Sequence, residues 1–349
     1  MSKLRIGVLS PADISSRRMI PAFIASDRCE YVGVAVATPE ERVRAFQSIM
    51  KNNDYDPPRD SYERGRQKAL AIKDEFGGRV FNGFMSMIES DDVDAVYIAL
   101  PPYLHATWGK EVLRAGKHLL MEKPFTVSLE ETYELVDMAR DSGLAVIENF
   151  GFVYHPQMDK IREIIGSGTI GEVRLIRSNF GFPHRGEGDF RYKKELGGGA
   201  VLDCGCYTLK LASLLLGNDM EITGHELFAQ DDGLDISGTV TAIGRSGVPA
   251  QLSFGMDQQY CCNLEVWGSE GCITSNRIYT APAGYEMELS VTRGMDTEKI
   301  RVEGTDQFRL VAEQLVHLTE DADARTVLYN EILMQSELVE SVKDGGRMR

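Results

Sequence analysis

Three polar residues stand where side chains can exchange a proton or orient a small molecule. Lys123 closes the apolar stretch "KHLLMEKP", residues 117–124. Proline disfavours helical geometry in the residue before it, so Lys123 is expected in an extended turn, and its peptide bond to Pro124 can be cis. Asp203 and Tyr207 are four residues apart at the start of a predicted helix, which places them on one face. A surface turn and ordinary helix packing also explain these residues, so spacing alone leaves both interpretations open.

The chain begins with a strand, a tight turn and a helix in "LRIGVLSPADISSRRMIPAF", residues 4–23. A dinucleotide-binding protein carries G-x-G-x-x-G at this place. The equivalent positions here are Ser10, Ala12 and Ser15. Ser10 and Ala12 are small, and amides at a helix start can still face a pyrophosphate, but Pro11 has no N–H to donate. The turn is therefore a candidate phosphate site from which the glycines are missing.

The elements that must position these residues alternate between strand and helix over the first 150 residues. Apolar runs predict strands at 4–10, 31–37, 93–100, 117–124 and 145–150. Ser128, Glu131 and Gly143 mark the start and end of one of the helices between them. This alternation predicts parallel βαβ units in an α/β, doubly wound parallel sheet. Ligands of such a sheet bind beyond the carboxyl ends of its strands.

Residues 46–69 do not fit this compact pattern. They separate the second strand from a predicted helix at 70–78, and they contain Pro57 and Pro58. We interpret the segment as an inserted surface loop, with a lid or a subunit contact as the alternative.

Beyond residue 150 the pattern changes to strands at hairpin spacing. Helices are predicted at 156–168 and after the glycines of "GGGAVLDCG", and a last helix at roughly 306–343. Strands are predicted at 221–230, 235–244, 249–256, 261–268, 272–276 and 285–292. Strands without intervening helices favour a C-terminal α+β domain with an open, mostly antiparallel sheet. We predict domains at 1–124 and 125–349.

Composition narrows the class of protein. The net charge of −15 repels phosphate backbones, so nucleic acid is not an expected partner. The six cysteines form no C-x-x-C and the histidines have no metal-ligand spacing, so we expect reduced thiols and no metal site. No signal peptide precedes the first strand, and no apolar run reaches the roughly 20 residues that span a bilayer. A cytoplasmic protein without a membrane partner is expected.

Taken together, these stretches resemble the Gfo/Idh/MocA family of nicotinamide-dependent oxidoreductases. The resemblance runs almost end to end and rests on "IGVLSPADIS", "VDAVYIALPPYLH", "AGKHLLMEKPF", "GGGAVLDCGCY" and "VWGSEGCI". It implies an N-terminal Rossmann-type domain for the dinucleotide and a C-terminal domain for substrate and oligomerisation. The branch includes dihydrodiol dehydrogenase, aldose dehydrogenases and sugar-nucleotide ketoreductases, which implies an NAD(P)-dependent enzyme for a sugar, polyol or related carbonyl.

The resemblance also implies roles for individual residues. Lys123 matches the lysine beside nicotinamide and substrate, Tyr207 the proposed acid/base, and Asp203 the aspartate one turn earlier. A lysine ammonium about 4 Å from a phenol is worth roughly 4 kcal/mol at an effective dielectric near 20, which favours tyrosinate. One departure is Val153, where relatives commonly carry arginine. The residues expected at the cofactor are Ser10, Pro11, Ala12, Asp13, Ile14, Thr38, Arg42, Leu100, Pro101, Pro102, His105, Glu122, Lys123 and Asn149.

The cofactor is expected to be NADP or NAD, with NADP favoured. An acidic residue after the second strand would bind the ribose 2′-hydroxyl of NAD, and Thr38 occupies that position. Arg42 or Arg44 could reach a 2′-phosphate from the following helix.

Two other functions stay open on the sequence alone. Some relatives bind the dinucleotide without catalysis and regulate partners, and a few are glycosidases that use tightly held NAD. A homodimer or homotetramer is expected, because relatives pair through the face of the C-terminal sheet.

Overall fold

The computed structural model describes residues 2–50, 60–186 and 188–344. The chain forms two compact units, each of which is treated by itself. The first comprises Met1–Asn149 and Phe308–Leu333, and the second Phe150–Gln307 and Met334–Arg349. These bounds differ from the predicted domains 1–124 and 125–349, because the strand at Val146–Glu148 and the helices near the C-terminus pack with the first unit. The functional division at residue 124 stays a prediction.

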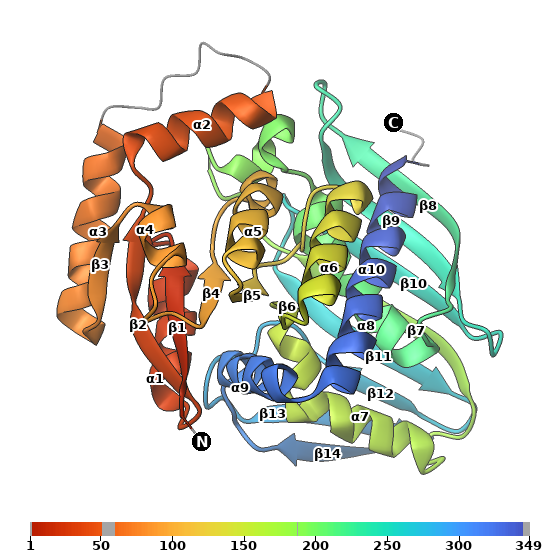
Figure 1. Ribbon diagram of the computed structural model, residues 1–349. Coiled ribbons are helices and arrows are strands. Elements are labelled where there is room, and N and C mark those ends of the chain that lie inside the picture. Colours follow the sequence, from red (N-terminus) through yellow and green to blue (C-terminus); the bar gives the residue numbers. More distant parts are fainter. Residues whose placement is uncertain (1, 51–59, 187, 345–349) are drawn as a thin grey trace. The chain divides into compact units, whose positions relative to one another are not determined.

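The first unit is built on a six-stranded sheet with the order β3-β2-β1-β4-β5-β6, and all of its strand pairs are parallel (Figure 1). Its strands are β1 (Leu4–Leu9), β2 (Cys29–Val36), β3 (Arg79–Asn82), β4 (Ala95–Ile98), β5 (His118–Met121) and β6 (Val146–Glu148). All four residues of β4 have no exposed surface, as expected for a strand covered on both faces. The predicted doubly wound parallel sheet is confirmed.

Helices of the first unit follow its strands. They are α1 (Ile20–Ala25), α2 (Pro39–Met50), α3 (Asp60–Phe76), α4 (Phe84–Ile88), α5 (His105–Arg114) and α6 (Leu129–Ser142). A π-helix at Ser15–Met19 precedes α1, and a 3₁₀ turn at Pro102–Leu104 precedes α5. Ser128 caps α6 by accepting from the Glu131 amide, and Gly143 ends it in the left-handed conformation, as the sequence predicted.

The interpretation of residues 46–69 as a surface loop is wrong at both ends. Residues 46–50 continue α2, and residues 60–69 belong to α3; residues 51–59, which include the two prolines, lie outside the described residues. The outer face of α3 is rich in exposed charge, which obscured its helical period. Its inner face buries Ala69 and Ile72. Since α3 contacts β2 and β3, it is part of the first unit's layer of helices.

The second unit is built on an eight-stranded sheet with the order β14-β13-β12-β11-β7-β10-β9-β8. Its strands are β7 (Val173–Gly181), β8 (Glu221–Ala229), β9 (Asp235–Ile243), β10 (Pro249–Gly255), β11 (Cys261–Gly268), β12 (Cys272–Ser275), β13 (Met287–Arg293) and β14 (Asp296–Val302). Only β7 and β10 pair in parallel among these described strands. The mostly antiparallel sheet is confirmed, although β7 and β14 were not predicted.

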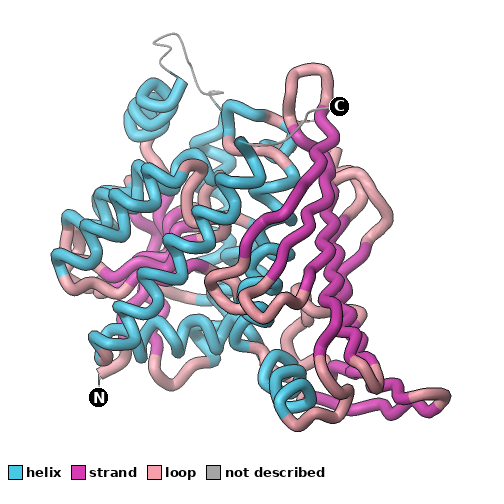
Figure 2. The backbone as a smooth tube through the Cα atoms, turned by 90° about the vertical axis from the view of Figure 1, so that its right-hand side faces the viewer, coloured by secondary structure: helices cyan, strands magenta, loops and turns pink. Residues whose placement is uncertain are grey.

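Helices α7 (Pro156–Gly166) and α8 (Cys206–Leu216) belong to the second unit, and α8 packs on β7 and β10. Figure 2 shows the strands of this sheet nearly edge on, with helices on one side. The strands alternate accordingly: in β11, buried Cys262, Leu264 and Val266 are interleaved with partly exposed neighbours. The core of the unit therefore lies between the sheet and these helices.

The single C-terminal helix predicted at 306–343 is instead two helices, α9 (Gln307–Glu320) and α10 (Ala322–Asp344). Asp321 separates them, and its Oδ1 accepts a hydrogen bond from the Ala324 amide at 2.9 Å. An aspartate that caps a helix competes with continued helix, which explains the break.

One segment, Lys194–Leu216, is long and apolar enough to cross a membrane by length and composition, contrary to the sequence expectation. Within it, 72% of the most apolar window is buried inside the protein. This is the behaviour of a core helix, and α8 forms its C-terminal half.

Candidate active site

The turn after β1 keeps the shape of a phosphate turn without its glycines. Ser10 has φ of +85°, the left-handed region that glycine adopts at no cost. Its amide donates to the Ala35 carbonyl at 3.1 Å, and its carbonyl accepts from the Ser15 hydroxyl at 3.2 Å. Helical structure begins at Asp13, so the first-turn amides of Ala12, Asp13 and Ile14 lie at a helix start. Amides at a helix start are the groups that can face a pyrophosphate.

The side chain of Asp13 points toward α3. Lys68 lies 3.3 Å from its Oδ1, and both side chains are well exposed. A carboxylate beside a phosphate site is unfavourable for an anion, and the Lys68 ammonium compensates for part of that charge. The exposure of the pair keeps the effect small.

The turn after β2 is closed by a reciprocal cap. The Thr38 hydroxyl accepts from the Glu41 amide at 3.2 Å, and the Glu41 carboxylate accepts from the Thr38 amide at 2.8 Å. Glu41 also accepts from the amides of Phe84 and Met85, both at 2.9 Å. Because both oxygens of Glu41 are used by backbone groups, this carboxylate is not placed to bind a ribose hydroxyl.

The side chain of Arg42 extends from this turn toward α3. A Cβ added at Gly65 would lie 3.2 Å from Arg42 Nη2 and 3.2 Å from Val36 Cγ1. The guanidinium is therefore packed where α3 meets the end of β2. A cation at this strand end is the feature that NADP-binding folds use for the 2′-phosphate.

His105 joins the turns after β4 and β5. Its Nε2 lies 2.8 Å from the Leu100 carbonyl, and its Nδ1 lies 2.9 Å from the Pro124 carbonyl. Complete burial lowers the pKa of His105, and the carbonyl contacts oppose that shift without reversing it. The ring thus lies between the Pro101–Pro102 turn and the turn that carries Lys123, with one nitrogen close to a carbonyl of each turn.

Glu122 and Asn149 meet at the ends of β5 and β6. Glu122 Oε1 accepts from the Asn149 side-chain amide at 2.6 Å and from the Tyr97 hydroxyl at 2.5 Å. Burial raises the pKa of Glu122, although these two donors and Lys123 act to lower it. Two of the predicted cofactor residues are therefore brought together, and the buried Tyr97 is a partner that the sequence analysis missed.

Lys123 lies in the turn that follows β5. The Lys123–Pro124 peptide is cis, and the next amide, that of Phe125, donates to Glu148 at 2.8 Å. Glu148 is 8% exposed and anchors this turn from β6. The turn that presents Lys123 is thus fixed on both sides, by His105 and by Glu148.

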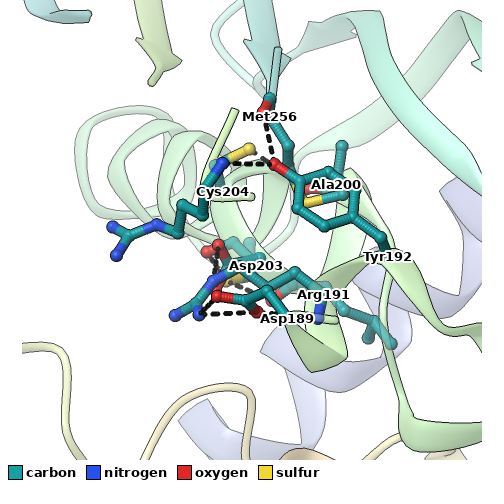
Figure 3. A network of polar contacts seen from close by, with 10 residues as sticks. Asp189, Arg191, Tyr192, Ala200, Asp203, Cys204 and Met256 are labelled. Carbon is teal, nitrogen blue, oxygen red and sulfur yellow. Dashed lines mark hydrogen bonds and ion pairs between the residues drawn. The ribbon is translucent and has the colours of Figure 1, made fainter. Parts of the chain in front are cut away.

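Asp203 and Tyr207 belong to the second unit. Asp203 lies in a π-helix, Val201–Gly205, that runs directly into α8, and Tyr207 is the second residue of α8. Asp203 Oδ2 accepts from Arg191 Nε at 2.8 Å. Arg191 Nη1 also donates to Asp189 at 3.2 Å (Figure 3). The sequence analysis did not identify Arg191 or Asp189.

The ring of Tyr207 is surrounded by other aromatic rings. Phe150 and Phe180 both have ring centroids 5.1 Å from that of Tyr207, and Tyr279 lies at 5.4 Å. These edge-on contacts fix the plane of the phenol. The Tyr279 hydroxyl bonds to that of Ser178, and full burial raises its pKa well above 10, so it stays protonated.

Among the missed residues, only Glu41 had a local signal. "TPEE" at 38–41 is a T-x-x-E capping box with proline at the first helical position. Arg191 pairs with Asp203 across 12 residues of irregular chain, and Asp235 reaches Val201 across 34, so no period in the sequence marks them. Among the described residues no group of three or more His, Cys, Asp or Glu could hold a metal ion.

A parallel sheet with this strand order, a turn of this shape after β1 and a lysine turn after β5 define a dinucleotide-binding oxidoreductase. Comparison with known families agrees. Residues 44–150 match "Oxidoreductase family, NAD-binding Rossmann fold", and residues 158–274 match "GFO/IDH/MocA C-terminal domain". The chain belongs to the Gfo/Idh/MocA family of oxidoreductases.

Relatives of known activity cover most of the chain. This chain is 40% identical over 306 residues to a dTDP-3,4-didehydro-2,6-dideoxy-alpha-D-glucose 3-reductase from Streptomyces violaceoruber. The match covers 87% of this chain and 82% of that one. A 3-ketoreductase from Actinomadura kijaniata, crystallised with NADP and TDP-benzene, superposes with a TM-score of 0.87 at 34% identity over 99% of both chains. A D-xylose 1-dehydrogenase (NADP(+)) from Haloferax volcanii is 27% identical over 93% of this chain and 91% of that one.

Proposed function

We propose that this enzyme reduces the keto group of a dTDP-linked deoxysugar with NADPH. The observation that carries the proposal is its similarity, over 99% of both chains, to the NADP-bound 3-ketoreductase. The relatives from Streptomyces violaceoruber and Actinomadura kijaniata are named for the same 3-reduction. That it is cytoplasmic and a homodimer or homotetramer remains part of the proposal.

The residues present fit the cofactor. The amides of residues 12–14 would hold the pyrophosphate at a helix start. Arg42 would hold the 2′-phosphate, and the use of Glu41 in capping both α2 and α4 supports NADP over NAD. The turns at Leu100, Pro101 and Pro102 and at Glu122, together with Asn149, would hold the nicotinamide end.

When bound, NADPH supplies a hydride to the carbonyl carbon. The carbonyl oxygen then gains negative charge and needs a proton, which the Tyr207 hydroxyl donates. The ammonium of Lys123 orients the carbonyl oxygen and favours the tyrosinate that results. Asp203 holds the start of the helix that carries Tyr207. Crystal structures of the Actinomadura kijaniata enzyme include one variant with a lysine replaced by alanine and one with a tyrosine replaced by phenylalanine, the residue types that our proposal uses.

The test is NADPH consumption with a dTDP-linked 3-ketosugar. Tyr207→Phe removes the donated proton and Lys123→Met removes the charge, and each should lower kcat by about 100-fold or more. Matched controls are Tyr285→Phe and Lys73→Met at exposed positions, which should turn over like the parent enzyme. Unchanged turnover in both Tyr207→Phe and Lys123→Met would show the mechanism to be wrong, and a faster reaction with NADH would overturn the cofactor assignment.

A further inference from the structure

The guanidinium of Arg191 ties a loop to the helix that carries Tyr207. It donates from Nε to Asp203 at 2.8 Å and from Nη1 to both oxygens of Asp189, at 3.2 and 3.3 Å. The Arg191 and Asp203 side chains are only 20% and 12% exposed. Burial opposes the charge of Arg191, but the two aspartates raise its pKa above the usual value, so it stays cationic. An ion pair held this far from water is expensive to break from one side.

The glycine run 197–199 permits this approach. The Gly199 amide donates to the Arg191 carbonyl at 3.0 Å, and the Gly198 amide donates to the Lys193 carbonyl at 3.0 Å. A Cβ at Gly198 would lie 2.4 Å from the Arg191 carbonyl oxygen, which no side chain tolerates. The backbone of the loop therefore reaches the start of the π-helix only because residue 198 has no side chain.

The π-helix is held from a second direction by Asp235 at the start of β9. Its Oδ2 accepts from the Val201 amide at 2.6 Å, and a Cβ at Gly199 would lie 2.4 Å from its Oδ1. A π-helix is a widened turn that is uncommon and frequently found at functional sites. Asp235 holds its first residue and Arg191 holds Asp203 in its middle, so the register of the following helix is set just before Tyr207.

The charge of Arg191 also matters chemically. A carboxylate one turn from a phenol opposes the loss of the phenol's proton. Arg191 pairs with Asp203 and compensates for its negative charge, which reduces this opposition.

We propose that Arg191 is a positioning residue for the reaction, acting through Asp203 to hold and charge-balance the helix start that presents Tyr207. The proposal rests on the proposed role of Tyr207 as proton donor. It assigns to the segment 189–199 the function of setting kcat rather than binding the cofactor, whose predicted contacts all lie in the first unit.

The experiment compares Arg191→Met, Arg191→Lys, Asp203→Asn and the double variant R191M/D203N, each by kcat, KM, NADPH binding and thermal unfolding. Arg177→Met is the matched control, because Arg177 pairs with Glu265 in the same unit, away from this network. The assay uses a dTDP-linked 3-ketosugar and, in parallel, oxidation of D-xylose with NADP⁺. Activity on D-xylose alone would refute the proposed substrate and still permit the Arg191 test.

We expect Arg191→Met to lower kcat by about tenfold or more, with the NADPH dissociation constant and the control unchanged. Arg191→Lys should restore part of the loss. A further variant, Arg191→Ala, should be partly rescued by added guanidinium. R191M/D203N should be no slower than Asp203→Asn alone, since both changes remove one interaction. The proposal would be overturned if Arg191→Met kept the kcat of the parent enzyme. It would also be overturned if the fold losses of the two single variants multiplied in the double variant. If Arg191→Met unfolds, absence of any kcat loss in Arg191→Lys would overturn it as well.

Discussion

The backbone of Ser10 adopts a conformation that costs an L-residue free energy. Its φ of +85° is uncommon for any residue other than glycine. Serine tolerates it because its side chain is small, whereas a β-branched side chain crowds the neighbouring carbonyl. Ser10→Val should therefore lower the free energy of unfolding by about 1–3 kcal/mol. Chemical denaturation measures this loss, and an NADPH titration should show weaker binding, because the turn that presents the amides is displaced.

Ser10→Gly is the matched control for this residue. Glycine removes the strain but makes the unfolded chain more flexible, so stability should stay within about 1 kcal/mol of the parent. Equal stability of the valine and glycine variants would contradict the assignment of a left-handed backbone to residue 10. The turn after β1, which lacks the usual glycines, would then need another structural explanation.

At the scale of elements, the glycine run before the π-helix is packed closely against the backbone of the loop that carries Arg191. Gly198→Ala places a Cβ 2.4 Å from the Arg191 carbonyl oxygen, so the backbone of the loop must move. We expect a loss of about 1–3 kcal/mol in unfolding free energy. We also expect a fall in kcat like that of Arg191→Met, with NADPH binding kept.

Gly166→Ala is the comparison for that substitution. Gly166 ends α7, and a Cβ there meets no atom within 4 Å. Alanine is the better helix former, so stability should be kept or rise by up to about 1 kcal/mol. Thermal unfolding of both variants separates the two cases, and a Gly198→Ala protein as stable and active as Gly166→Ala would contradict the close approach at residue 198.

What the sequence could predict at this scale follows from periodicity. The parallel strands other than β3, and α6, were predicted because apolar runs and caps such as Ser128 are local signals. Residues 60–69 of α3 were misread as loop because their exposed side chains are mostly charged. The partners of Asp203 could not be predicted, because Arg191 meets it through an irregular loop whose path depends on tertiary contacts. Lys123 was predicted because it lies at a strand end. The contacts of His105 and Glu148 with its turn could not be predicted, because the fold brings these residues together.

At the scale of the whole molecule, each unit carries half of the proposed chemistry. The first unit holds the predicted cofactor turns and Lys123, and the second holds Asp203 and Tyr207. Both units also contain histidines that are shielded from water. In the first unit His105 is buried and His118 is half-buried. In the second, the buried His155 caps α7, where its Nδ1 accepts from the Gln157 amide at 3.2 Å. Burial lowers the pKa of all three rings.

This burial gives the stability a pH dependence with a definite sign. An unfolded histidine binds a proton below about pH 6.5, while the folded ring with its lowered pKa does not. The unfolded state then holds more protons, so stability is full above that pH and falls as the pH drops. Burial raises the pKa of Glu122 and of Asp235, and these two carboxyl groups act in the opposite direction to the histidines. Their contribution to the free energy of unfolding falls as the pH rises from about 4. Because three rings act against two carboxyl groups, we expect a net fall in stability as the pH drops from about 7 to 5.5.

Urea unfolding at pH 5.5, 6.0, 6.5, 7.0 and 8.0 measures this dependence. His155→Asn removes one buried ring and keeps a side chain that can cap α7, so the fall in stability between pH 7 and 5.5 should shrink by up to about 1.4 kcal/mol per pH unit. His184→Asn, at an exposed position, should keep the parent's slope. A parent protein whose stability is flat or rising as the pH falls from 7 to 5.5 would contradict the expected net effect of the three rings.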